Sequence, residues 1–322
     1  MGELTALRAG PLTTVQDLGR AGHRQEGVSL GGALDRQAAR VANWLVGNEE
    51  SAALLEISLG RARFRFSDER TVGWCGGEFQ ISAGDEKFPP GHACAVHAGE
   101  EVEIAPTGRG CRAWIAISGG VDVPPVLGSR ATDLRARFGG WEGRALEDGH
   151  TLPLGTRALA GEMPRVSSWS APREWSQTAS PYPMLRVLRG AEWAEFSEAG
   201  RKLFLSQPFV VSPKCDRMGA RLEGEPLQRR RPNERVSEPV APGTIQVPDD
   251  GQPIILLGDC QTIGGYPKIG HVISVDLPRA AQLRPNDPVH FLEVTAGEAA
   301  LLHAERGEEL QRFRIGLKLR AR

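Results

Sequence analysis

The sequence lacks the features that mark several well-known classes of protein. No stretch approaches 18 uninterrupted apolar residues, and the first residues do not combine a charged segment with a long apolar one. We therefore expect a cytoplasmic protein that does not bind membranes. The 39 basic and 40 acidic residues nearly cancel to a formal net charge of -1, which argues against nucleic acid as a partner.

Cysteine is scarce and irregularly spaced. The five cysteines form an odd set without a Cys-x-x-Cys spacing, so they indicate neither a disulfide framework nor a zinc site. No pair of histidines has the His-Glu-x-x-His spacing, and we expect no bound metal. Cys75 and Cys260 lie beside glycine-rich turns, but buried thiols are the more common case, and we predict no catalytic role for them.

Two signatures of cofactor chemistry are also missing. The chain has no Gly-x-x-x-x-Gly-Lys-Ser/Thr phosphate loop and no Met-Lys-Met segment of the kind that carries biotin. We therefore expect no covalently attached biotin. A nucleotide would need a pocket without a phosphate loop, or a pocket shared with another subunit.

Glycine and proline are plentiful, with 39 and 23 residues, and they divide the chain into short apolar or alternating segments that are typical of strands. The predicted strands of the first half are 4–7, 62–66, 71–74, 93–97, 101–105 and 112–117. Those of the second half are 185–188, 203–205, 209–212, 244–247, 254–257, 271–275 and 289–294. Apolar residues at helical spacing predict helices at 35–46, 279–283 and 296–310. Together these elements predict a mainly β fold with a few helices, built as barrels or sandwiches.

The chain is long enough for two domains, since it has 322 residues, 40% of them hydrophobic. Prolines, serines and tryptophans gather between 161 and 183 without strand or helix periodicity, which indicates a linker. We predict a first domain at 1–165, a linker at 166–183 and a second domain at 184–322.

The two halves of the chain also echo one another. Asp35–Arg40 and Asp216–Arg221 share the pattern Asp-Arg-x-x-Ala-Arg, and Leu4–Gly10 parallels Leu185–Gly190. An ordered set of such matches indicates an internal duplication.

The segment that follows the apolar run 254–257 combines glycines with many polar groups. Adjacent glycines permit positive φ and a close approach of a ligand to the backbone. We predict a ligand-binding loop here, with Lys268, Tyr266 and the preceding Asp259 as catalytic candidates. The binding candidates in the loop are Gln261, Thr262, Gly264 and Gly265. The alternative is a glycine-rich barrel corner with a surface tyrosine and lysine.

A second candidate group lies between two predicted strands of the second half. Asp216 is an acid beside two cations, Arg217 and Arg221, whose guanidinium groups can bind a carboxylate or phosphate in bidentate fashion. A structural Asp-Arg network that holds a loop is an equal alternative. Glu238 is a further carboxylate that precedes the glycine-rich loop, and solvated carboxylates in turns are common.

A third group follows the first predicted strand. Gln16, Asp17 and Arg20 place an amide, an acid and a guanidinium after a Gly-Pro turn, and we predict that they bind substrate. A turn stabilised by Asp17 and Arg20 is the alternative.

These segments together resemble the second-subunit allophanate hydrolase family, also called the biotin-dependent carboxyltransferase-like family, over nearly the whole chain. The resemblance is carried by Gly10-Pro11 with Val15–Arg20, Leu55–Ile57 around Glu56, Ile117–Arg130, Thr132–Arg135 with Phe138–Gly140, Asp216–Gly219 with Arg221-Leu222, and Gln261-Thr262 with Gly264–Ile269.

The resemblance implies two cyclophilin-like β-barrel domains related by internal duplication. It also implies a non-autonomous component of an ATP-dependent 5-oxoprolinase, which opens the lactam of 5-oxoproline, or pyroglutamate, to give glutamate. The implied partners are the B subunit of that enzyme, which is similar to the first allophanate hydrolase subunit, and its A subunit. The implied ATP is held by a partner or shared with one. A homo-oligomer also stays open.

The same family leaves two other functions open. One is a regulatory protein that binds and antagonises a kinase-inhibitor-like partner. The other is a carboxyltransferase subunit that acts on urea or a related amide with carboxybiotin supplied in trans. The chain departs from the family pattern at Ala220, Cys260 and Ile263, where an aromatic residue, an arginine and a threonine are common. These departures leave the natural substrate open.

Overall fold

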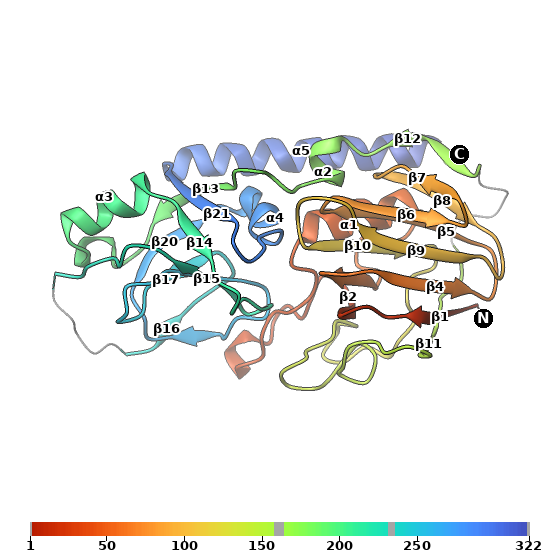
Figure 1. Ribbon diagram of the computed structural model, residues 1–322, viewed down its shortest axis with the longest axis horizontal. Helices are drawn as coiled ribbons and strands as arrows, with labels where there is room; N and C mark the ends of the chain where they lie inside the picture. The colour runs from red at the N-terminus through yellow and green to blue at the C-terminus, as the bar shows by residue number, and fades with distance from the viewer. Residues whose placement is uncertain (1, 158–163, 231–235, 321–322) are drawn as a thin grey trace. The chain divides into compact units, whose positions relative to one another are not determined.

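The computed structural model describes residues 2–157, 164–230 and 236–320 (Figure 1). The chain forms two compact units that are not continuous in sequence. The first unit comprises Met1–Arg20, Gly31–Ala179 and Arg312–Arg322, and the second comprises Ala21–Leu30 and Ser180–Gln311. The domain boundaries at 165 and 184 stay a prediction.

The first unit contains two six-stranded sheets. In spatial order, one sheet consists of β11 (Thr151–Pro153), β1 (Glu3–Arg8), β4 (Ala62–Phe66), β9 (Glu101–Pro106), β6 (Phe79–Ala83) and β7 (Glu86–Phe88). The other consists of β12 (Val166–Ser170), β8 (His92–Val96), β5 (Arg70–Gly76), β10 (Arg112–Ile117), β3 (Leu54–Ser58) and β2 (Leu12–Gln16). The strand pairs of both sheets are antiparallel.

The burial patterns of these strands follow from what covers each face. In β4, Phe64 and Phe66 are buried whereas Arg63 and Arg65 are exposed, as expected for a strand with one face in the core. Every residue of β3, β5 and β10 is buried. Helix α1 (Arg36–Leu45) packs against β5 and β10 and so supplies the cover for the second face (Figure 1).

Helix α1 forms where the apolar spacing predicted it. The Asp35 carboxylate caps it by accepting a hydrogen bond from the backbone N–H of Ala38 at 2.8 Å. The short helix α2 (Arg173–Ser176) follows in the same unit.

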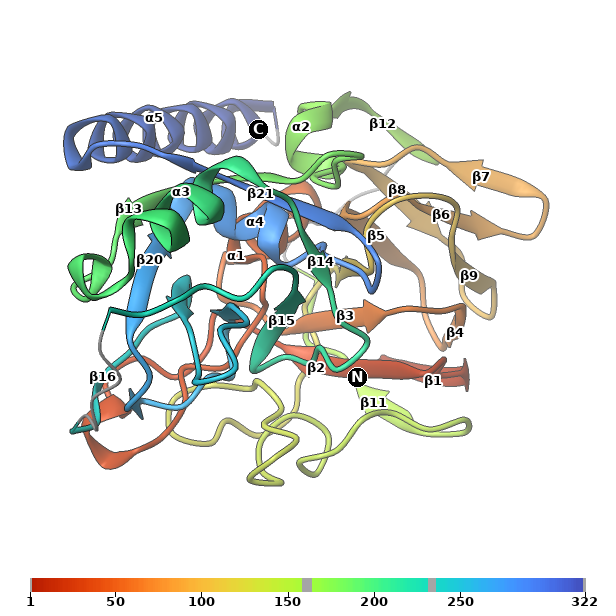
Figure 2. The ribbon, with the colours of Figure 1, turned by 60° about the vertical axis from the view of Figure 1, so that its left-hand side comes forward.

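The second unit contains a closed barrel of seven strands (Figure 2). Their spatial order is β13 (Met184–Arg189), β20 (Lys268–Val272), β17 (Thr244–Gln246), β18 (Ile254–Leu256), β15 (Gly219–Glu223), β14 (Phe209–Val211) and β21 (Pro288–Glu293). The pairing of β13 with β21 is parallel. A two-stranded sheet joins β16 (Glu238–Pro239) to β19 (Ile263–Gly264). The mainly β prediction is confirmed, and this unit provides a barrel.

Helices and 3-10 turns complete the second unit. They are η1 (Arg24–Glu26), η2 (Trp193–Glu195), α3 (Glu198–Ser206), η3 (Ser274–Asp276) and α4 (Leu277–Ala280). Helix α5 (Ala296–Arg320) contributes residues to both units. Phe204 of α3 stacks on Phe291 of β21 with ring centroids 4.4 Å apart, and Phe209 packs beside both rings. This aromatic cluster joins α3 to the strands of the barrel.

One predicted strand is wrong, because 203–205 lies inside helix α3. The helix begins where the Ser197 hydroxyl accepts a hydrogen bond from the backbone N–H of Gly200 at 3.0 Å. An apolar run of three residues has no period of its own, so the cap decides the structure.

The repeated Asp-Arg-x-x-Ala-Arg pattern does not adopt one structure. Its first copy caps and enters helix α1, whereas the second forms a turn at Asp216 that leads into strand β15. The other two matching segments do share a local structure. Each contains most of a strand, β1 or β13, and these strands have the same alternation of buried and exposed residues. The internal duplication stays a prediction.

Candidate functional site

The glycine-rich loop connects β18 to β20 and surrounds one buried amide, that of Gln246. The Gln246 Nε2 donates to the carbonyl oxygen of Tyr266 at 3.3 Å, and the Gln261 Nε2 donates to the Gln246 Oε1 at 3.4 Å. The carbonyl of Thr262 accepts from the backbone N–H of Val240 at 3.0 Å. The side chain of Tyr266 lies at the surface, because this residue is 49% exposed. Part of the polar content of the loop therefore maintains its own shape.

Gly264 serves close packing and not a left-handed backbone. Its φ lies outside the positive range that the sequence led us to expect. A Cβ atom at this position would lie 2.7 Å from the Gln246 Nε2, so the buried amide at the end of that side chain would have to shift. Glycine therefore allows the Gln246 amide to approach the backbone closely.

Replacing Gly264 by alanine is expected to lower the free energy of unfolding by about 1–2 kcal/mol, because the added methyl group displaces the Gln246 amide from its partners. Gly307→Ala is the control, since Gly307 lies in α5 with nothing within 4 Å of a Cβ atom. That change is expected to raise stability by about 0.5–1 kcal/mol. Urea denaturation measures the free energy of unfolding of both variants. Equal changes in the two variants would contradict this account of Gly264.

Lys268 begins strand β20 and contacts two carboxylates. Its Nζ lies 3.6 Å from the Glu192 Oε1 and forms a closer ion pair with the Glu238 Oε2. The backbone N–H of Lys268 also donates to the Glu192 Oε2 at 2.8 Å. The positive charge of Lys268 is therefore already compensated, which the sequence did not reveal.

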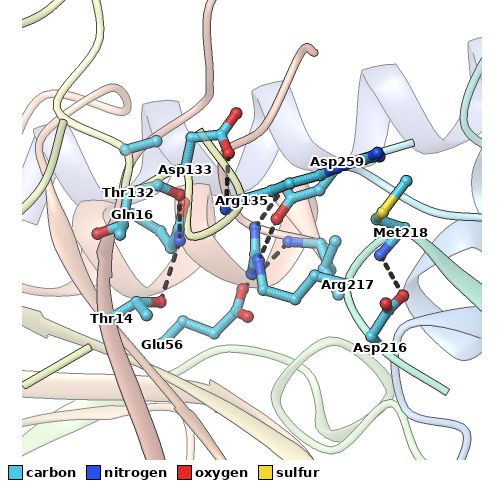
Figure 3. Close-up of polar contacts among 12 residues, drawn as sticks. Thr14, Gln16, Glu56, Thr132, Asp133, Arg135, Asp216, Arg217, Met218 and Asp259 are labelled. Carbon is cyan, nitrogen blue, oxygen red and sulfur yellow. Dashed lines mark hydrogen bonds and ion pairs between the residues drawn. The ribbon is translucent and has the colours of Figure 1, made fainter. Parts of the chain in front are cut away.

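Arg217 and Asp259 form a buried bidentate pair. The Arg217 Nε donates to the Asp259 Oδ2 at 2.8 Å, and the Nη2 donates to the Oδ1 at 3.0 Å (Figure 3). The backbone N–H of Asp259 donates to the carbonyl of Arg217 at 3.1 Å. Both side chains are nearly buried, at 5% and 11% exposure. This pair connects the end of β18 to the turn that precedes β15.

The neighbours of Arg217 have different surroundings, and a role of this group in anion binding stays a prediction. The Asp216 Oδ1 accepts hydrogen bonds from the backbone N–H groups of Met218 and Gly219, at 2.8 and 3.1 Å, and so stabilises its own turn (Figure 3). Arg221 is exposed on β15, where the flanking Ala220 and Leu222 are buried. Among the contacts that the structure describes, those of Asp216 and Arg217 fit the alternative of a structural network that holds a loop.

In the first unit, Gln16 lies at the end of β2 and is fully buried. Its Nε2 donates to the Thr14 Oγ1 at 3.0 Å and to the carbonyl of Thr132 at 3.3 Å (Figure 3). Its Oε1 is buried and has no hydrogen-bond partner among the residues that the structure describes. Because both N–H groups are used, the carboxamide presents an acceptor that a donor from a ligand or a water would satisfy.

Asp17 and Arg20 have structural contacts in the same unit. The Asp17 carboxylate accepts from Gly19 N at 2.7 Å, from Ser129 Oγ at 2.6 Å and from Arg130 N at 2.6 Å. The Arg20 guanidinium donates to the carbonyl of Ala131 and lies 4.5 Å above the ring centroid of Phe138. The stabilised-turn alternative thus accounts for these contacts.

Two buried carboxylates of the first unit were not among the predicted site residues. Asp35 caps α1 and is fully buried, and Glu56 is 1% exposed on β3. The Glu56 Oε2 accepts from the Trp114 Nε1 at 2.8 Å and from Leu34 N at 3.2 Å. Burial raises the pKa of Asp35 to about 7, with a further rise from the charge of Glu56, against the lowering effect of the hydrogen bond from Ala38.

Stability is expected to fall as the pH rises from 5 to 8. The folded protein holds the Asp35 proton up to a pKa of about 7, whereas an unfolded chain releases it near the ordinary value of 3.8. The unfolded state therefore binds fewer protons in this range, and the decline is on the order of 2–4 kcal/mol. Asp35→Asn keeps an oxygen for the helix cap and removes the titration. Unfolding free energies measured at both pH values should fall less in this variant, and equal declines would rule out Asp35 as the cause.

The cysteines do not provide an activated thiol. All five are free, and all but Cys215 are buried. Burial raises the pKa of Cys260 to about 11, and it also raises the pKa of Cys75. Among residues 2–157, 164–230 and 236–320, no three His, Cys, Asp or Glu side chains gather as metal ligands would. None of the described helices has the length and apolar character that crossing a membrane requires.

Comparison with known proteins places this chain in a family. Residues 26–293 match the family model of the carboxyltransferase domain, subdomain A and B, and the chain belongs to this family. It is 38% identical to the C subunit of 5-oxoprolinase from Escherichia coli over 92% of this chain and 93% of that protein. It is 33% identical to the 5-oxoprolinase C subunit of Haemophilus influenzae over 94% of each chain.

A solved structure extends the comparison. The crystal structure of the K. lactis urea amidolyase has a TM-score of 0.88 and 27% identity, and it is matched over 97% of this chain. This chain spans 20% of that protein. The resemblance to the family drawn from the sequence motifs is therefore confirmed.

Proposed function

We propose that this chain is the C subunit of an ATP-dependent 5-oxoprolinase, a complex that hydrolyses 5-oxoproline to glutamate. The observation that carries this proposal is the 38% identity to the Escherichia coli protein, because the match extends over nearly the full length of both chains. The match covers 93% of the Escherichia coli subunit, whereas this chain spans 20% of the urea amidolyase.

The proposed chemistry activates an amide. A lactam carbon is a poor electrophile, so a phosphoryl group passes from ATP to the lactam oxygen and ADP leaves. Water then adds to the imidate carbon, and the C–N bond breaks as the nitrogen takes up a proton, which gives the amine and an acyl phosphate. A second water hydrolyses the acyl phosphate to the carboxylate of glutamate and free phosphate. In this proposal Lys268 binds the carboxylate of 5-oxoproline, and the loop that carries Gln261 and Thr262 positions the ring.

ATP enters this proposal as a substrate of the complex. Because the sequence has no phosphate loop, we propose that ATP is held by a partner or lies in a pocket shared between a partner and this chain. The proposed partners are the B subunit, which resembles the first allophanate hydrolase subunit, and the A subunit. Both bacterial relatives are named as one lettered component of 5-oxoprolinase, which supports an assembly of several different chains.

A second candidate is carboxyl transfer from carboxybiotin, supplied in trans, to urea or a related amide. The observations that favour it are the carboxyltransferase description of the family and the TM-score of 0.88 to the urea amidolyase. The lower identity of 27%, against 38% for the bacterial protein, places it second.

The two candidates are separated by adding this chain to Escherichia coli 5-oxoprolinase that lacks its own C subunit. We expect glutamate release from 5-oxoproline and ATP to return. The matched assay supplies urea and a carboxybiotin carrier under the same conditions. Carboxylated urea without any glutamate release would instead favour the second candidate.

A further inference from the structure

The ion pairs of Lys268 differ in a way that bears on ligand binding. Glu192 is 5% exposed at its side chain and makes two contacts with Lys268, one with the ammonium group and one with the backbone N–H. The backbone N–H of Glu192 in turn donates to the carbonyl of Lys268 at 3.3 Å. Glu192 is thus held to both the main chain and the side chain of Lys268, as a permanent counter-ion would be.

Glu238 is placed differently. Its side chain is 49% exposed, and it reaches Lys268 from β16, a strand of two exposed residues. The backbone of β16 is paired with β19, with Glu238 opposite Gly264, and Val240 N donates to the carbonyl of Thr262. The Glu238 carboxylate therefore reaches Lys268 from a strand that pairs with the glycine-rich loop, and it stays accessible to solvent.

The Lys268 ammonium group contacts two carboxylates of different exposure. The side chain of Lys268 is 15% exposed, and the more buried Glu192 supplies a counter-ion. The pair with Glu238 is half-exposed and contributes little to stability, as is usual for such pairs. A carboxylate from a ligand can replace it at small cost.

We propose that Glu238 is an internal competitor that occupies the ligand-facing side of the Lys268 ammonium group and is displaced by the carboxylate of a small acidic ligand. Glu192 keeps its contacts during this exchange. Glu238 thereby lowers the affinity of the loop for carboxylates and leaves the binding of ligands without a carboxylate unchanged. This inference rests on the proposed function for the identity of the ligand, 5-oxoproline.

The test compares two ligands on two variants of the full chain. Glu238→Gln removes the competing charge, and Glu293→Gln removes a surface partner of Arg189 elsewhere in the second unit. Calorimetry measures the Kd of 5-oxoproline and of 2-pyrrolidinone, a lactam of the same ring that has no carboxylate. We expect Glu238→Gln to bind 5-oxoproline about five- to tenfold more tightly than wild type, with 2-pyrrolidinone unchanged and Glu293→Gln like wild type.

Three outcomes would overturn the inference. The first is an unchanged Kd for 5-oxoproline in Glu238→Gln, and the second is an equal gain in affinity for both lactams. The third is that neither the wild-type chain nor Glu238→Gln binds 5-oxoproline. Turnover by the assembled complex tests the proposed function separately. A complex that turns over without the gain in affinity rejects the role of Glu238 alone, whereas a gain in affinity without turnover rejects the proposed function alone.

Discussion

Arg217→Met is expected to lower the free energy of unfolding by about 3–5 kcal/mol, because it leaves the Asp259 carboxylate nearly buried without its bidentate partner. Methionine retains most of the apolar stem, so the loss measures the charge and the hydrogen bonds of the guanidinium group. The same change to Arg221 is the matched control, since Arg221 is exposed on the next strand. There we expect a change within about 0.5 kcal/mol.

Urea denaturation of both variants at neutral pH measures the difference. Equal losses in the two variants would show that the pair with Asp259 does not support the barrel. A further variant, Asp259→Asn with Arg217→Met, should recover part of the loss, because no buried charge is then left unpaired.

Lys268→Met is expected to lower kcat/KM for 5-oxoproline by about 100-fold or more in the assembled complex, because it removes the cationic partner that we propose for the ligand carboxylate. The same change removes the counter-ion of the buried Glu192 and should also lower stability. The two effects must be separated before the loss is assigned to binding.

The double variant Lys268→Met with Glu192→Gln separates them. Removing both charges leaves no buried carboxylate unpaired, so stability should return toward the wild-type value while kcat/KM stays low. The measurement pairs urea denaturation with initial rates at several concentrations of 5-oxoproline. Full activity in either variant would exclude Lys268 from substrate binding, and activity that returns with stability would assign it a structural role.

The sequence was informative wherever a local pattern determines the structure. The segments 62–66 and 112–117 coincide with β4 and β10, because their apolar residues and flanking turns specify strands directly. Helix α1 was predicted from apolar residues at helical spacing, and Asp35 is its cap. The strand predicted at 203–205 is wrong because an apolar run of three residues has no period of its own, and Ser197 caps a helix that includes it.

The candidate site was less predictable, since its contacts join distant parts of the chain. Arg217 and Asp259 were both named from the sequence, but nothing showed that they pair across 42 residues. Glu192 was not named at all, although it contacts Lys268 across 76 residues. The motifs described the loop as polar and glycine-rich, yet they did not show that the Gln246 amide packs closely against Gly264.

The short repeated sequence pattern predicted the structure least well. The pattern Asp-Arg-x-x-Ala-Arg begins a helix at Asp35 and a turn followed by a strand at Asp216, because the residues that follow have different periodicity. In both copies the aspartate caps nearby backbone N–H groups, so the shared chemistry is local capping. Specific family motifs over the whole chain predicted far more than this short repeat.

The measurement that tests the central claim most directly is 5-oxoproline-dependent ATP hydrolysis with glutamate release, using the purified A and B partner proteins of 5-oxoprolinase with and without this chain. The proposed function predicts that neither product forms in the absence of this chain and that adding it restores both in equal amounts. Equal turnover with and without the chain would contradict its place in the enzyme.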